Sequence, residues 1–223
     1  GTIQVAGSGS SGYPSQRHVV QNNFGIWAFY TDGTAKVAFS DDGVNWTAGQ
    51  NVFTDNTGIT GVPAVFYVEA SSTVYVFAGP TAEGGTGRIT KAVLSGAGLP
   101  TFTPQRNLSM DLVNSAVITE NVKNLGSNPG NISPSITVTV DPVTGLATND
   151  PANGKNYAVW VAYSGRCTSG CGNNRFRIGA VRVHPDTLIK FSATNNAYGD
   201  TGSGNANTTP DHKWPFVVQA STA

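Results

Sequence analysis

The chain has 223 residues, 39% of them hydrophobic, and its 13 basic and 13 acidic side chains give a formal net charge of zero at pH 7. This balance excludes the basic face that nucleic acids require, and no apolar run reaches the roughly 20 residues of a membrane span. Only 12% of the residues are charged, against a typical value of about 25%, so the polar surface consists largely of Asn, Ser, Thr and Gly, which suits a secreted or cell-surface protein.

Short runs rich in Val, Ile, Tyr, Phe and Trp predict an all-β chain, because Gly, Asn, Asp or Pro bounds each run and no window shows the apolar stripe of a helix. The first unit of four strands is predicted at about 13–55. Its second run, Ile26 to Tyr30, is the most continuously apolar, which is typical of a strand packed on both faces. The four runs of this unit are 18–20, 26–30, 35–40 and a weaker 47–53.

The turn after the third run carries the most specific motif of the chain, Ser40-Asp41-Asp42-Gly43-Val44-Asn45-Trp46. Asp42 can accept hydrogen bonds from nearby backbone amides, and Gly43 can take a positive φ. Trp46 can pack on the strands, and Ser40 can close a local hydrogen bond. The motif resembles the Asp-box (Ser-x-Asp-Gly-x-x-Trp) of sialidases and related β-propellers, where it joins the third and fourth strands of a blade. The resemblance implies a propeller and a structural role for these four residues.

The same order of strands is predicted twice more, in units at about 60–108 and 132–193. A further first run at 215–218 begins another unit at 214. Repeated four-strand units favour a β-propeller of four-stranded antiparallel blades over 1–223, with about three blades and the first strand of a fourth. The runs of the second and third units are 63–68, 74–78, 88–95, 101–106, 134–140, 157–163, 177–183 and 188–192.

The blade count raises a question of closure, because closed propellers have at least about four blades. We therefore expect the ring to be completed by further segments of a longer polypeptide or by further copies of the chain. A β-sandwich with irregular strand lengths is the competing fold. Segments rich in Gly, Asn, Thr and Pro interrupt the units and are expected to be functional loops or disordered tips; they lie at about 110–132, 142–155, 165–174 and 194–213.

Several side chains carry further chemistry. Cys167 and Cys171 are predicted to form a local disulfide at a hairpin tip, which implies an oxidising compartment. Asp141 and Asp150 offer oxygen ligands, but their spacing matches no defined calcium loop, so we predict no cofactor and keep calcium as the single alternative. Asn-x-Ser/Thr triplets mark candidate N-glycosylation sites at Asn45, Asn107, Asn131 and Asn207.

The resemblance to sialidases raises the question of catalysis. The family's Arg-Ile/Leu-Pro motif is missing near the first unit, where Arg17-His18-Val19 does not match it. The chain has three glutamates, Glu69, Glu83 and Glu120, and none lies in a recognisable catalytic context. Glu69, at the end of a first-strand run, is placed to face a central channel. Arg88 begins a third run, as does Arg177, so both are expected to be solvated or to pack between blades.

These observations predict an extracellular, non-catalytic propeller that binds a glycan or protein ligand, or that acts in adhesion or fibre assembly. The low charge, the polar insertions and the missing catalytic set support this prediction. One alternative is a sialidase-like glycoside hydrolase whose catalytic residues lie partly outside this chain. Another is a self-assembling structural subunit whose open blade is completed by another copy.

Overall fold

The computed structural model describes residues 18–55, 63–79, 87–108, 135–150, 155–166 and 176–189. Over these ranges the protein is built from β-strands, as the sequence predicts, and the one described helical segment is a single 3-10 turn, η1 (Glu69–Ser71). None of the described residues forms a helix long and apolar enough to cross a membrane.

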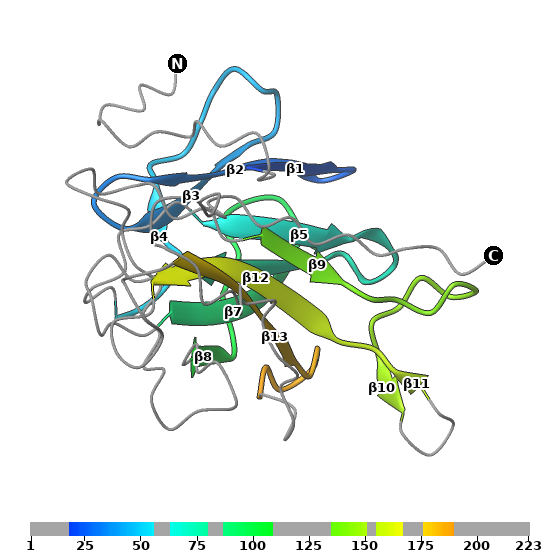
Figure 1. Ribbon diagram of the computed structural model, residues 1–223. Coiled ribbons are helices and arrows are strands. Elements are labelled where there is room, and N and C mark those ends of the chain that lie inside the picture. The colour runs from blue at the N-terminus through cyan, green and yellow to red at the C-terminus, as the bar shows by residue number, and fades with distance from the viewer. Residues whose placement is uncertain are drawn as a thin grey trace.

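The first and second sheets are antiparallel meanders with the same connectivity (Figure 1). In each, four consecutive strands lie side by side in chain order, so that every strand pairs with the strand that follows it. The first sheet contains β1 (Val19–Asn22), β2 (Gly25–Thr31), β3 (Ala35–Ser40) and β4 (Gln50–Asn51). The second contains β5 (Ala64–Val68), β6 (Thr73–Ala78), β7 (Gly87–Val93) and β8 (Gln105–Leu108).

The third sheet repeats the first three strands of this meander. Its described strands pair in the order β13-β12-β9 and are antiparallel. A separate two-stranded hairpin projects between β9 and β12 (Figure 1). The strands are β9 (Ser135–Val138), β12 (Val159–Arg166) and β13 (Phe176–Val183), with β10 (Asn149–Asp150) and β11 (Lys155–Asn156) in the hairpin.

The second sheet lies between the other two, and this position explains the composition of β6. Val74, Val76 and Ala78 pack into the core shared with the first sheet. Tyr75 and Phe77 point the opposite way, into the core shared with the third sheet. All six residues of β6 are buried, so the prediction that a second strand packs on both faces is confirmed for β6. In β2, by contrast, only alternate residues are buried.

The first strands β1, β5 and β9 follow one another along one edge of the stack (Figure 1). Asn22 at the end of β1 donates from Nδ2 to the Tyr67 hydroxyl of β5 (3.2 Å) and to the Leu94 carbonyl (2.8 Å). β5 in turn contacts β9. Over the described residues, the three sheets form an open stack and do not close into a ring.

The fourth strands depart most from prediction. β4 is shorter than the run predicted at 47–53, and β8 lies further along the chain than the run predicted at 101–106. The strand predicted at 188–192 is wrong for Leu188 and Ile189, because Leu188 has a φ of +58° and its N–H donates to the His184 carbonyl (2.8 Å), which closes a turn. Residues 190–192 and the run at 215–218 lie outside the described residues.

Candidate functional site

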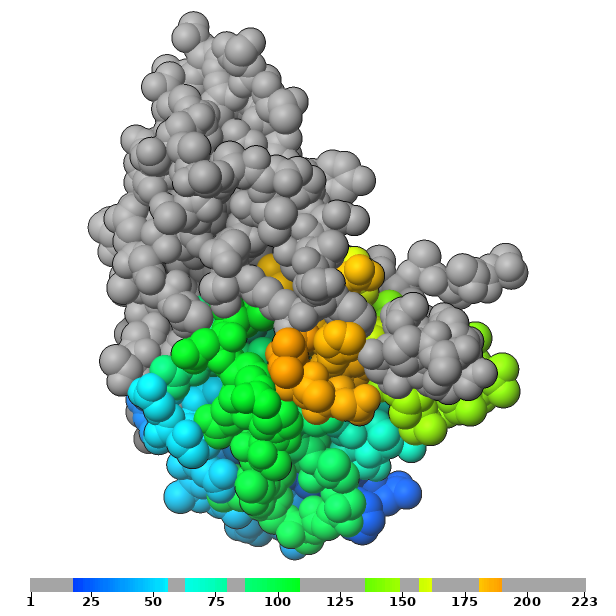
Figure 2. All heavy atoms as spheres, turned by 90° about the horizontal axis from the view of Figure 1, so that it is seen from below, coloured from blue at the N-terminus to red at the C-terminus, as the bar shows by residue number. Residues whose placement is uncertain are grey.

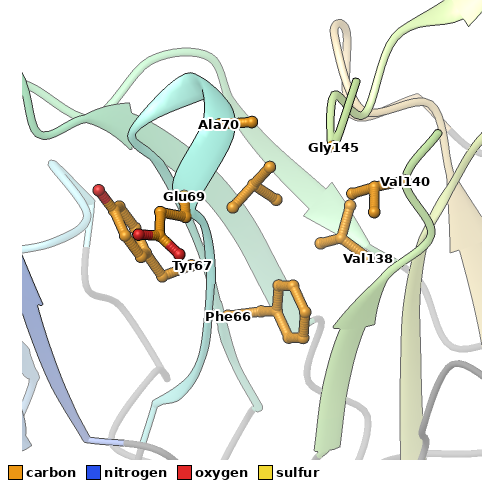
Figure 3. A pocket seen from close by; sticks show the side chains of 8 residues that line it. Phe66, Tyr67, Glu69, Ala70, Val138, Val140 and Gly145 are labelled. Atoms are coloured by element: carbon orange, nitrogen blue, oxygen red, sulfur yellow. The ribbon is translucent and has the colours of Figure 1, made fainter. Parts of the chain in front are cut away.

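A cavity of about 450 Å³ lies where β5 of the second sheet faces β9 of the third (Figure 3). Because β5 is the edge strand of its sheet, side chains from both of its faces can reach the same space. Most of the lining is apolar, and Glu69 supplies the one charged group. The lining residues are Phe66, Tyr67, Val68, Glu69, Ala70, Val138, Val140 and Gly145.

One wall of the cavity is built by β5 and η1. Alternation along β5 sends Phe66 toward the core shared with the third sheet and Tyr67 toward the core shared with the first. The chain then turns, since Ser72 takes a left-handed φ of +49° and its N–H donates to the Glu69 carbonyl (3.0 Å). This turn leaves Glu69 and Ala70 exposed at the cavity.

The opposite wall depends on a turn held by Asp141. Its Oδ1 accepts hydrogen bonds from the backbone N–H groups of Val143 (2.8 Å) and Thr144 (3.1 Å), and its carbonyl accepts one from Gly145 (2.7 Å). Gly145 has a φ of +69°, and a Cβ there would stand 3.0 Å from the Cβ of Ala70. Glycine is therefore favoured on two counts, the backbone conformation and the close approach of the two walls.

The polar groups of the cavity are few and lie on one side. Tyr67 and Glu69 are two residues apart, and Figure 3 shows the Glu69 carboxylate beside the Tyr67 ring. The Tyr67 hydroxyl accepts the hydrogen bond from Asn22 Nδ2 described above. An apolar, aromatic space with a carboxylate and a phenol matches the usual composition of small-ligand sites, in which a few polar groups fix the orientation.

The Ser40–Thr47 turn (the Asp-box-like turn) is organised by one carboxylate. Asp42 Oδ1 accepts from the backbone N–H groups of Val44 and Asn45 (2.7 Å each), and Oδ2 accepts from Asn45 Nδ2 (2.7 Å). Together these bonds hold the pKa of Asp42 well below its usual range, and the backbone N–H groups of Asn45 and Val44 make the largest contributions. Ser40 Oγ accepts from the Gly43 N–H (2.8 Å), and Gly43 has a φ of +76°.

The far end of this turn is hydrogen-bonded back to the strand before it. Thr47 donates its N–H to the Phe39 carbonyl (2.8 Å), and its hydroxyl accepts from the Phe39 N–H (2.9 Å). Trp46 is half-buried, whereas residues 41–45 are exposed. None of these turn residues lines the cavity, so the structure does not bring the sequence motif and the cavity together.

Some of the remaining sequence-predicted residues lie within the described ranges, and others lie outside them. Asn45 and Asn107 are exposed, the first in the turn and the second in β8. Arg88 forms an ion pair with Asp55 (2.6 Å), which joins β7 to the chain after β4. Asp141 is buried and braces its turn, and the described residues contain no group of three or more His, Cys, Asp or Glu that could hold a metal. Cys167, Cys171, Asn131, Asn207, Glu83, Glu120 and Arg17 lie outside the described residues.

Sequence reasoning singled out Glu69 but missed its neighbours in the cavity. Phe66 and Tyr67 have the pattern of any buried strand, so nothing in the sequence distinguishes them as lining residues. Gly145 and Ala70 are far apart in the chain, and only the contact of β5 with β9 brings them together. A glycine three residues after an Asp-Pro pair is the local signal in the sequence that marks Gly145.

Three comparisons were made with known proteins: a scan of protein-family models, a search of curated proteins and a search of solved structures. None of them finds a match to this chain.

Proposed function

We propose that this chain is part of an extracellular β-propeller of the Asp-box type whose role is to bind a glycan, with the cavity between β5 and β9 as its site. The arrangement of the sheets supports the propeller, because consecutive meanders stack face to face and their first strands share one edge (Figure 1). In a propeller, first strands line the central channel, so this cavity would open toward it. The Asp-box-like turn supports the same assignment, since it joins β3 to β4.

The observation that carries the binding role is the composition of the cavity. Sugars present both apolar C–H faces and hydroxyl groups. The Phe66 and Tyr67 rings suit the former, and the Glu69 carboxylate accepts hydrogen bonds from the latter. The low charge and the Asn-, Ser- and Thr-rich composition of the chain support an extracellular location.

A glycan array followed by calorimetric titration of the best binder tests this role. Glu69 is exposed, so Glu69→Gln leaves packing intact, and loss of its charge-assisted hydrogen bonds is expected to weaken binding by about ten-fold. Asp32→Asn, an equally conservative change at an exposed residue outside the cavity, is the matched control. Equal affinity in Glu69→Gln and Asp32→Asn, or an array with no bound glycan, would contradict the proposal.

A second candidate, a sialidase-like glycoside hydrolase, rests on the proximity of Tyr67 and Glu69 in one cavity (Figure 3). The resemblance to sialidases implies a tyrosine nucleophile assisted by a glutamate, and this pair has the required residue types. A fluorogenic sialoside distinguishes the two candidates. No turnover is expected for a binding protein, whereas turnover that disappears in both Tyr67→Phe and Glu69→Gln would establish the hydrolase.

A further inference from the structure

Each contact between neighbouring sheets is called a seam here: the first seam joins the first and second sheets, and the second seam joins the second and third. Hydrogen bonds to a turn stabilise the second seam. The turn follows β13, and its Pro185 carbonyl accepts hydrogen bonds from Lys91 Nζ (2.8 Å) and from the Tyr75 hydroxyl (3.3 Å). The Thr187 carbonyl accepts a third, from Arg106 Nε (3.3 Å). Figure 2 shows this orange segment against the green residues of the second sheet. The turn after the third strand of one sheet thus covers the strands of the sheet before it.

The first seam, between the first and second sheets, is fastened in the same way. The loop after β7 carries the Gly98 carbonyl, which accepts a hydrogen bond from Trp27 Nε1 (2.9 Å). Two further contacts come from the same loop: Gln50 Nε2 donates to the Pro100 carbonyl (3.2 Å), and the rings of Phe29 and Phe102 meet edge to face at 6.4 Å. Both seams therefore follow one rule, in which a backbone carbonyl after the third strand of the later sheet accepts a hydrogen bond from an aromatic side chain in the second strand of the earlier sheet.

Strand register identifies the corresponding position on the third sheet. Trp27 pairs across to Phe39, Tyr75 to Lys91, and Trp160 to Arg182. Val159 and Val161 point into the core shared with the second sheet, so alternation places Trp160 on the opposite face. Trp160 is half-buried, and the Arg182 guanidinium carbon lies 5.8 Å from the centroid of its ring.

By the same rule, one turn of the stack has no neighbouring sheet to cover within the described residues. The Asp-box-like turn follows β3 of the first sheet, which is at the opposite end of the stack, so among the described residues there is no earlier sheet for it to cover. Val44 at its tip is 62% exposed. The outer face of β2 presents Ile26, Ala28 and Tyr30, all half-buried, and the loop after β3 lies against part of this row, since a Cβ at Gly43 would meet Ile26 and one at Gly49 would meet Tyr30.

We infer that the face of the third sheet that bears Trp160 and Arg182 docks the Asp-box-like turn of a second copy of this chain. Residue chemistry at the second seam favours this occupant. There, the carboxylate of Asp186 opposes the lowering of the Lys91 pKa that burial causes, so an acidic turn faces a basic third strand. Asp41 and Asp42 would face Arg182 in the same way. The zero net charge of the chain also removes general repulsion between copies.

Such a contact joins different surfaces of the two copies, so it produces either a closed ring or an open filament. Sedimentation velocity of the full chain measures this association. Concentrations of about 1–100 µM are suitable, because interfaces of modest size associate in this range. We expect a mass that rises with concentration in steps of the 23.1 kDa chain. A single 23.1 kDa species at every concentration would overturn the inference.

Charge exchange tests the specific pair. Arg182→Glu and Asp41→Lys are each expected to weaken association at least about ten-fold, and the double variant is expected to recover most of it. Asp41 is exposed and makes none of the turn hydrogen bonds given above, so Asp41→Lys remains informative even if Arg182→Glu fails to fold. Asp32→Lys, the same charge change on the β2–β3 turn at an exposed residue whose ion pair with Lys36 (3.2 Å) lies within its own sheet, is the control. Association equal to wild type in Asp41→Lys would overturn the inference, whatever the outcome of the glycan experiments.

Discussion

Asp42 gives the Asp-box-like turn a defined dependence on pH. Hydrogen bonds to the ionised carboxylate depress its folded-state pKa, while the unfolded chain keeps the ordinary value of 3.8. The stabilisation is therefore fully present above about pH 4 and is lost as the pH falls toward the folded-state pKa. Denaturant titrations from pH 7 to pH 2 should show wild type more stable than Asp42→Asn, with the gap closing below pH 4. A gap that stays constant over this range would show that the charge of Asp42 is not what stabilises the turn.

His18 should produce a second dependence, at higher pH. Burial lowers its pKa below the ordinary value of 6.5, and both ring nitrogens are buried without a hydrogen-bond partner among the described residues. Because the folded state favours neutral imidazole, stability is highest above pH 6.5 and is lost as the pH falls below that value, where the unfolded chain takes up the proton. Thermal unfolding at pH 7.5 and pH 5.5 measures the effect. His18→Gln should flatten the difference between the two, and an equal pH dependence in the variant would contradict this account.

The turn was readable from the sequence because its interactions are local. Asp42 reaches atoms no more than three residues away, so the identities of neighbouring residues determine them. The cavity follows from different physics. Its walls come from β5 and from the turn at Asp141, and no local pattern encodes the distance between them. Glu69 could be singled out because it ends an apolar run, but its neighbours could not.

Among the described strands, β6 is buried on both faces along its whole length. Phe77 is fully buried in the core between the second and third sheets, and Gly87 on the neighbouring strand has no room for a Cβ, which would come within 2.7 Å of the Phe77 ring. Phe77→Ala is therefore expected to cost about 3–5 kcal/mol of unfolding free energy. Val93→Ala, at a position that is 56% exposed, should change it by less than about 0.5 kcal/mol. Chemical denaturation measures both, and similar losses would contradict the burial argument.

The first three strands of each unit could be predicted, whereas the fourth could not. Long apolar runs with Val, Ile and aromatic residues identify β2, β6 and β12 directly. The outer strands β4 and β8 have polar sequences with exposed residues, so their positions are set by pairing with β3 and β7 rather than by their own composition. Leu188 illustrates the limit: its apolar side chain is buried, but a turn rather than a strand buries it.

On the scale of the whole molecule, the stack should open from its ends. The second sheet has a neighbour on each face, and each seam contributes its own core and hydrogen bonds. A stack of this kind behaves approximately as units coupled to their nearest neighbours. Hydrogen exchange followed by mass spectrometry should therefore find the slowest amides in β6 and faster exchange in β1 and β4. Slower exchange in β1 than in β6 would contradict this order.

Because each sheet is covered by a turn that comes later in the chain, the order of synthesis determines when its aromatic residue can be covered. Trp27 and the Gly98 carbonyl that covers it are 71 positions apart, and Tyr75 and Pro185 are 110 apart. At about 5–20 residues per second, the ribosome needs roughly 4–14 s after Trp27 before its partner has been made, and roughly 6–22 s in the case of Tyr75. Each nascent sheet thus waits with an aromatic residue uncovered until the following sheet emerges. Those seconds are the interval in which a chaperone that binds exposed aromatic side chains has access to this chain.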